Sequence, residues 1–365
     1  MALNNNSSSK KRVAILIENG VEDAEFLIPY NAFKMSEVET VVLGSRMNEK
    51  YKGKQGKMTH SADGTTTEAR PEDFDAVIIP GGMAPDKMRC NPNTVKFVQN
   101  MMEQGKWVAA VCHGPQVLIE GDLLRGKNAT GFVSIRKDMM NSGAIYLNKP
   151  VVIDGNLITS RQPGDLAIFT TAILHRLGLG KQAGLPDENN NLAEWWKLAD
   201  AWGGSTKGEI AKALNTALAG EHYSLEALEQ YAEKADYLKL KLLLKDFIAI
   251  KRRHIDQLET RLQELGEKPS LPSAMAEPYA KLKSGLQSSD DIAVTKRALG
   301  DIQTGVVDVF NLRAQTTDPI STALFTEIEQ HLAEQEQQLV ELYQTMLGSK
   351  SPEPATPSTG AAISL

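Results

Sequence analysis

The residues of this 365-residue chain best suited to chemistry are Cys112 and His113. They follow an apolar run, 107–111, and precede Gly114-Pro115, which predicts a strand that turns into a helix at the cysteine. Such an elbow at the carboxyl edge of a parallel sheet presents a nucleophile where open α/β folds bind ligands. Because a helix N-terminus favours a thiolate, we expect the pKa of Cys112 to lie below the free-cysteine value of about 8.5, with His113 as its base or charged partner.

Two further segments carry residues that suit the same chemistry. Gly81 and Gly82 follow the apolar run 75–80, and paired glycines let backbone N–H groups approach a ligand, as an oxyanion site requires. Residues 18–25 follow the first apolar run and place several carboxylates in the first turn of an expected helix. The glycines also fit a plain turn, and the carboxylates also fit ordinary charge placement at a helix N-terminus. The functional interpretation has one carboxylate reaching Cys112 across the sheet edge.

The elements that must position these residues follow from the hydrophobic pattern. Short apolar runs, typical of buried parallel strands, occupy residues 12–17, 40–44, 75–80 and 107–111. Helix-length segments lie at 23–35, 93–104, 114–124, 135–141 and 165–177, and Asp154-Gly155 predicts a hairpin over 151–160. Strands that alternate with helices predict an α/β fold with a parallel sheet covered by helices on both faces.

Four motifs give residues 12–178 a resemblance to a known family. They are Gly20-Val21-Glu22-Asp23-Ala24-Glu25, Pro80-Gly81-Gly82, Val111-Cys112-His113-Gly114-Pro115 and Thr159-Ser160-Arg161. In this order and spacing they resemble the PfpI/ThiJ superfamily of intracellular proteases and protein deglycases, and the His-Gly-Pro form is similar to its PfpI branch. The resemblance implies the flavodoxin-like fold of the class I amidotransferases.

The resemblance also implies catalytic roles. Cys112 would be the nucleophile, Glu22 the acid that hydrogen-bonds its sulfur, and His113 the base. In PfpI an acid in the loop after Pro-Gly-Gly completes the triad from a neighbouring subunit. Asp86 stands at that position here and is one methylene shorter than the family's glutamate. The resemblance implies a homo-oligomer in which Asp86 acts on the neighbouring site, and the alternative is a site built within one chain.

A nucleophilic thiol beside backbone N–H groups favours attack on an electrophilic carbonyl. By resemblance the backbone of Gly82 and His113 forms the oxyanion site, with Gly81 and Arg161 in the same binding region. Peptide bonds and 2-oxoaldehydes such as methylglyoxal, or their adducts on proteins, both fit, so we expect a stress-protective peptidase or glyoxalase/deglycase without a cofactor. The alternative is a sensor without turnover, in which oxidation of Cys112 is the signal.

Composition and charge exclude other classes. The net charge is −6, with 21 basic and 19 acidic residues up to position 180 and 19 and 27 beyond it, so nucleic acid is not an expected partner. No apolar run reaches the roughly 18 residues that span a bilayer, and the first residues do not form a signal peptide, so we expect a cytoplasmic protein without membrane contact. The second cysteine, Cys90, lacks the elbow context and is expected to be a structural or surface thiol.

The second half has a different hydrophobic pattern, in which apolar residues recur with the 3.6-residue period of helices over long segments. It predicts four helices at 207–234, 236–265, 290–314 and 319–347, with breaks at 266–272 and 317–319. The expected domain order is a disordered N-terminus (1–11), the α/β domain (12–180), a linker with an apolar anchor (181–206), the bundle (207–347) and a disordered tail (348–365). Residues 254–259 and 265–269 make the bundle resemble ferritin-like, Dps-related domains.

Polar residues interrupt the apolar stripes of these helices. Glu221 and Lys251 lie near the centres of their stripes, His254 flanks the second, and His331 lies in the fourth. Ferritin-like chemistry needs several core-facing carboxylates with Glu-x-x-His pairs, and Lys251 stands where such a pair before His254 would have its glutamate. We therefore expect a buried Glu221–Lys251 ion pair in an assembly module without metal. The alternative is a retained iron site, for which Glu221, His254 and His331 are the candidate ligands.

Overall fold

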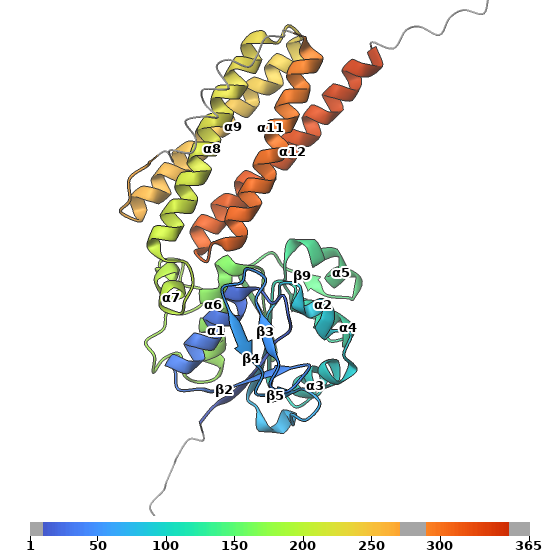
Figure 1. The fold of residues 1–365 in the computed structure, drawn as a ribbon, viewed down its shortest axis with the longest axis vertical. Coiled ribbons are helices and arrows are strands. Elements are labelled where there is room, and N and C mark those ends of the chain that lie inside the picture. Colours follow the sequence, from blue (N-terminus) through green and yellow to red (C-terminus); the bar gives the residue numbers. More distant parts are fainter. Residues whose placement is uncertain (1–9, 271–289, 350–365) are drawn as a thin grey trace, which may run out of the picture. The chain divides into compact units, whose positions relative to one another are not determined.

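The computed structural model describes residues 10–270 and 290–349, which divide into two compact units (Figure 1). The first comprises the described residues up to Ile210 together with Arg313–Ala323, and the second comprises 211–312 and the described residues from Leu324 onward. The termini predicted to be disordered lie outside the described residues except for positions 10, 11, 348 and 349. The predicted break at 266–272 lies partly outside them.

The first unit is built on a seven-stranded sheet with the strand order β10-β11-β7-β6-β1-β2-β5. Its strands are β1 (Arg12–Leu16), β2 (Glu39–Gly44), β5 (Gly64–Thr65), β6 (Ala76–Ile79), β7 (Trp107–Val111), β10 (Val151–Asp154) and β11 (Leu157–Ser160). All neighbouring strands are parallel except β10 and β11, which form the predicted hairpin. The central strands are apolar on both faces because both faces are covered, and β6 is wholly buried.

Helices lie on both sides of this sheet (Figure 1). One group consists of α1 (Asp23–Met35), α6 (Leu166–Arg176) and α7 (Trp195–Ala201), in which α6 contacts both of the others. The other consists of α2 (Ala84–Met88), α3 (Pro92–Glu103), α4 (Pro115–Glu120) and α5 (Arg136–Asn141). The predicted α/β architecture is confirmed. The segment expected to be a linker contains α7, and its Trp195 and Trp202 are part of the hydrophobic core of this unit.

Several short elements were absent from the predicted set. Apart from α2 and the edge strand β5, they are two small pairings, β3 (Lys50–Lys52) with β4 (Thr59–Ser61) and β8 (Asn128–Ala129) with β9 (Ile145–Tyr146), and the 3₁₀ turns η1 (Pro71–Asp73), η2 (Val133–Ile135) and η3 (Pro163–Asp165). Each has only two or three residues, which is too short for a periodic pattern to reveal.

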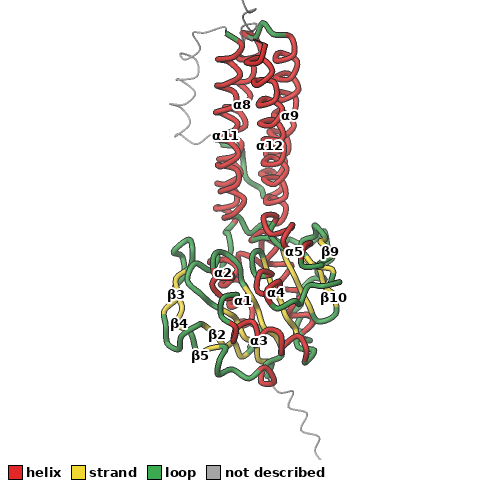
Figure 2. The backbone as a smooth tube through the Cα atoms, turned by 90° about the vertical axis from the view of Figure 1, so that its right-hand side faces the viewer, coloured by secondary structure: helices red, strands yellow, loops and turns green. Residues whose placement is uncertain are grey.

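Four long helices form the bundle, α8 (Lys207–Lys234), α9 (Leu238–Glu264), α11 (Asp291–Gln315) and α12 (Pro319–Ser349) (Figure 2). They agree with the predicted ranges to within two residues at each end. α9 ends just before Gly266, whose φ of +70° suits glycine, and Pro319 opens α12. None of the described helices is long and apolar enough to cross a membrane.

Candidate functional site

Cys112 occupies the predicted elbow between β7 and α4. Its φ is +60°, a left-handed conformation that costs energy for a residue other than glycine. The backbone N–H of Cys112 still extends the sheet by donating to the carbonyl of Ser160 at 3.0 Å. The side chain is 6% exposed, so the thiol sits in a tight site at the sheet edge rather than on an open surface.

His113 contacts the thiol and is held in one orientation. Its Nδ1 lies 3.2 Å from Sγ of Cys112, and its Nε2 lies 3.1 Å from Oγ of Ser134. The ring stacks on Phe132 with centroids 5.1 Å apart. Burial, and then the charge of Lys54, lower the pKa of His113, so the imidazole is neutral near pH 7. If Nε2–H donates to Ser134, Nδ1 is left as an acceptor for the thiol proton.

The acid beside the sulfur is Glu25, whereas Glu22 was predicted for this position. The Glu25 carboxyl interacts with the Cys112 thiol, and its Oε2 accepts the N–H of Gly81 at 2.7 Å. Glu22 lies at the start of α1 and its Oε2 is 3.5 Å from Nζ of Lys54. Glu22 is the N-cap of α1 and has an extended backbone, whereas Glu25 lies inside the first helical turn, so the two side chains leave the chain in different directions.

Burial changes the protonation of this pair. It raises the pKa of Glu25 to about 8, with a further contribution from the charge of Glu22. Burial, followed by the charge of Glu25, raises the pKa of the Cys112 thiol well above its ordinary value. The expectation of a lowered thiol pKa is therefore wrong in direction, because desolvation at this site outweighs the helix N-terminus. At pH 7 the group beside the sulfur is a neutral carboxylic acid.

The backbone N–H groups predicted to bind an oxyanion, those of Gly81, Gly82 and His113, have different partners in the structure. The N–H of Gly81 is used by Glu25, and the N–H of Gly82 contacts the sulfur of Cys112. The N–H of His113 has no acceptor among the described residues, so it remains for a ligand oxygen. A Cβ on Gly81 would lie 2.7 Å from both Glu25 Oε2 and the His113 nitrogen, which explains why glycine is needed there.

Arg161 and Asp86 are not brought to the thiol. Arg161 makes two hydrogen bonds to Asp165, at 2.9 and 3.0 Å, and one to Asn148 at 2.9 Å. It therefore ties β11 to the start of α6 rather than pointing a free guanidinium at a ligand. Asp86 is an exposed residue of α2, and within the described part of the chain its carboxylate makes no hydrogen bond to His113. Its action on a neighbouring subunit stays a prediction, as do the other assigned roles.

The raised pKa of Glu25 makes a testable prediction for thiol reactivity. The alkylation rate of Cys112 by iodoacetamide should rise with pH only above about 8, where the Glu25–Cys112 pair loses its first proton. Glu25→Gln should move the midpoint to lower pH, because it removes the charge that opposes the thiolate. Glu22→Gln is the matched control and should move it less, since the charge of Glu22 affects the thiol less. Mass spectrometry of the Cys112 peptide measures the rate, and a larger shift in Glu22→Gln would contradict this assignment.

The polar layer of the bundle contains the predicted ion pair and extends beyond it. Nζ of Lys251 lies 2.8 Å from Oε1 of Glu221, and both side chains are almost completely buried. Oε2 of Glu221 is 2.9 Å from Nδ1 of His254, and Nε2 of His254 is 2.8 Å from Nδ1 of His331. Burial opposes ionisation of Glu221, but Lys251 and His254 outweigh it and lower its pKa.

This layer does not fit the two-metal centre of ferritin-like bundles. Both oxygens of Glu221 are occupied, one by the Lys251 ammonium and one by His254. A buried cation in this position opposes a metal ion bound to the same carboxylate. Glu221 is therefore not free to bind a metal ion, although the sequence makes it a candidate ligand of a retained iron site.

Three residues near these centres were not assigned a role from sequence. Ser134 and Lys54 act on His113, and Glu327 lies beside His254 and His331. Ser134 and Lys54 come from loops or short turns without a motif. The spacing of Glu327 and His331, four residues apart on one helix, did carry a signal, because side chains at that spacing share a face.

Comparison with known proteins assigns both halves of the chain to recognised sequence groups. Residues 11–176 match the DJ-1/PfpI family, and residues 209–305 match a domain of unknown function, DUF2383. Deglycase PfpI of Pyrococcus furiosus is 39% identical over 155 residues, which cover 42% of this chain and 92% of that protein. YraA of Bacillus subtilis, provisionally named a cysteine protease, is 39% identical over 167 residues, 46% of this chain and 98% of that protein.

One solved structure resembles nearly the whole chain. It is a crystal structure from Anabaena variabilis, described as a two-domain protein with DJ-1/ThiJ/PfpI-like and ferritin-like domains. It is 65% identical, covers 96% of this chain and 100% of that chain, and has a TM-score of 0.89. The similarity therefore includes the helical unit and the order of the two units.

Proposed function

Because the chain belongs to the DJ-1/PfpI family, we propose that its first unit is a cysteine-dependent enzyme acting on 2-oxoaldehydes such as methylglyoxal, or on their adducts with protein amines. The observation that carries the proposal is the contact between the Cys112 thiol and the neutral His113 imidazole at 3.2 Å. A thiol with a raised pKa needs a base at the moment of attack, and His113 Nδ1 is placed to be that base.

The proposed first step balances with groups already in the site. As Sγ of Cys112 bonds to the aldehyde carbon, its proton passes to Nδ1 of His113 and the carbonyl electron pair moves to oxygen. That oxygen can accept the unused N–H of His113. Glu25, whose pKa is about 8, holds a proton at neutral pH that can neutralise the alkoxide and give a hemithioacetal.

The same geometry favours labile carbonyl adducts over unactivated peptide bonds. His113 is oriented by the hydroxyl of Ser134, and the described chain supplies no carboxylate to the imidazole. A peptide bond needs a strong base and then a strong acid for its leaving amine, which a carboxylate-oriented histidine provides. A hemiaminal adduct breaks more easily and makes smaller demands on the base. Peptidase activity is the second candidate, favoured by the name of the Bacillus relative.

Turnover of two substrates tests the proposal. Wild type and Cys90→Ser should release lactate from methylglyoxal and free amine from methylglyoxal-treated lysine peptides, while Cys112→Ser should lose at least about 10³-fold in kcat/KM. Cys90 is the matched control because it is an exposed thiol in the same unit. Faster cleavage of a fluorogenic peptide would favour the peptidase. Peroxide-driven oxidation of Cys112 without turnover of either substrate would favour the sensor.

A further inference from the structure

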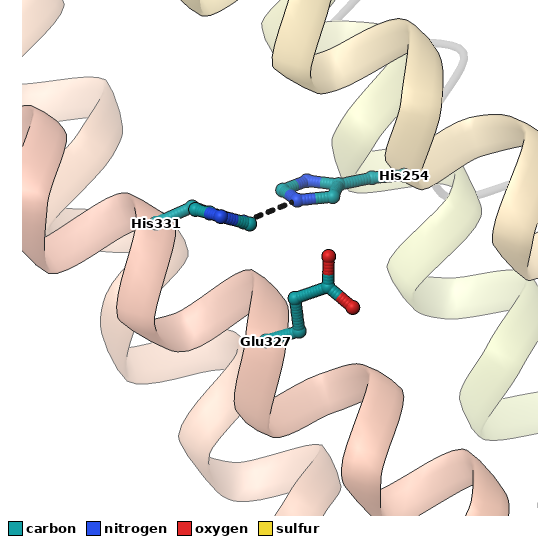
Figure 3. A group of neighbouring side chains, drawn as sticks. All are labelled: His254, Glu327 and His331. Atoms are coloured by element: carbon teal, nitrogen blue, oxygen red, sulfur yellow. Dashed lines mark hydrogen bonds between the residues drawn. The ribbon is translucent and has the colours of Figure 1, made fainter.

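Two imidazoles and a carboxylate converge between α9 and α12, outside the site described above. His254 lies on α9, and Glu327 and His331 lie one turn apart on α12 (Figure 3). One ligand atom from each of the three lies within 4.8 Å of the other two. The two imidazole nitrogens are 2.8 Å apart, and Figure 3 shows the Glu327 carboxylate beside both rings.

The hydrogen bonds around the cluster point a lone pair of His254 toward its centre. Because Nδ1 of His254 meets the Glu221 carboxylate, that nitrogen carries the proton and Nε2 presents its lone pair toward His331. Nδ1–H of His331 donates to that lone pair, and a bound metal ion would take the place of this proton. A carboxylate behind a histidine in this way is the usual outer partner of a metal-binding imidazole. Glu327 has an outer partner as well, since Nε2 of Gln257 donates to its Oε2 at 3.3 Å.

The guanidinium of Arg253 contacts two of the three residues of the cluster. A guanidinium nitrogen of Arg253 lies 3.3 Å from Nε2 of His331, and Arg253 also pairs with Oε1 of Glu327 at 3.6 Å. The Arg253 side chain is 52% exposed, so it can move into solvent without leaving a buried charge. Glu327 and His331 are partly exposed as well, which gives an ion a route to the cluster.

We propose that His254, Glu327 and His331 bind one divalent transition-metal ion of the Zn²⁺ type. Two imidazoles and one carboxylate are a common protein ligand set for zinc with a fourth position open to water. Ligand atoms at 2.0–2.1 Å from a tetrahedral ion lie roughly 3.3 Å apart. The two nitrogens are 2.8 Å apart while they share a proton, so they must separate slightly once an ion replaces that proton, and rotation of the partly exposed Glu327 side chain brings the carboxylate to the ion. Lys251 confines the site to a single ion, because it neutralises the carboxylate that a second ion would need.

Zn²⁺ titration of the full-length chain by calorimetry tests this site. Cys90→Ser/Cys112→Ser should serve as the background, because free thiolates also bind zinc. We expect one ion per chain, with affinity lowered at least about 100-fold by His331→Gln and about 10-fold or more by Glu327→Gln. Arg253→Gln should raise the affinity, because it removes the competing cation.

Glu334→Gln is the matched control, since it removes an exposed carboxylate three residues after His331 without removing a ligand. The visible spectrum of the Co²⁺ form should show four-coordination and change in His331→Gln. Both main variants alter partly exposed side chains, and circular dichroism verifies that they fold. Zinc uptake unaffected by His331→Gln, uptake lowered equally by Glu334→Gln, or two ions per chain would each overturn the proposal.

Discussion

Gly81→Ala is expected to lower kcat/KM for the carbonyl substrate by about 100-fold or more, because a shift of about 1 Å in a catalytic group costs that much. The added Cβ would lie 2.7 Å from Glu25 Oε2, 2.7 Å from the His113 nitrogen and 2.9 Å from the Cys112 Cβ. Two of these neighbours are backbone or Cβ atoms, which cannot rotate away. The substitution therefore pushes apart the acid, the nucleophile and the unused N–H group.

Gly64→Ala is the matched control for this prediction. Gly64 is also outside the left-handed region and lies in β5 of the same unit, but a Cβ there would meet only Leu43 at 3.5 Å, an ordinary contact. Steady-state kinetics and melting temperature should be measured for both variants. Activity in Gly81→Ala close to that of Gly64→Ala would show that the Glu25–Cys112–His113 spacing does not limit the reaction.

The elbow could be predicted because its signals are local. A buried apolar run and Gly114-Pro115 define the ends of β7 and α4, and Cys112 must lie between them. The choice between Glu22 and Glu25 could not be predicted from the sequence. Glu22 immediately precedes α1 and Glu25 lies in its first turn, and only the packing of the helix decides which carboxylate faces the sheet. The pKa of Cys112 was mispredicted for a related reason. The helix N-terminus is visible in the sequence, whereas complete burial beside an acid appears only in three dimensions.

The bundle shows the same division between local and non-local information. The helix ranges follow from periodicity and from Gly266 and Pro319, and the central positions of Glu221 and Lys251 on their stripes predicted that they meet. The contact of His254 with Glu221 on one side and His331 on the other depends on how three helices are rotated about their axes. A helical wheel places each residue on its own helix, but it does not give the register between helices.

Glu221→Ala should lower the free energy of unfolding of the bundle by about 3–5 kcal/mol, because Lys251 would be left buried without a counter-charge. Glu229→Ala is the matched control. It breaks the 2.8 Å pair with Arg252, also between α8 and α9, but these side chains are 44% and 65% exposed, so the loss should be about 0–1 kcal/mol. All four tryptophans lie outside the second unit. Far-UV circular dichroism of the full chain in denaturant, compared with tryptophan fluorescence, therefore separates the two transitions.

Removing both charges tests whether the unpaired charge of Lys251 causes the loss of stability in Glu221→Ala. The double variant Glu221→Leu/Lys251→Met removes both ions, yet it should recover only part of the loss. His254 Nδ1–H would lose its acceptor in a fully buried position, and an unsatisfied buried donor costs about 1–3 kcal/mol. Adding His254→Leu should recover most of the remainder, because the freed nitrogen of His331 is partly exposed and can bond to water. Full recovery in the double variant would mean that His254 contributes little to the layer. No difference between Glu221→Ala and Glu229→Ala would mean that Lys251 reaches solvent when its partner is removed.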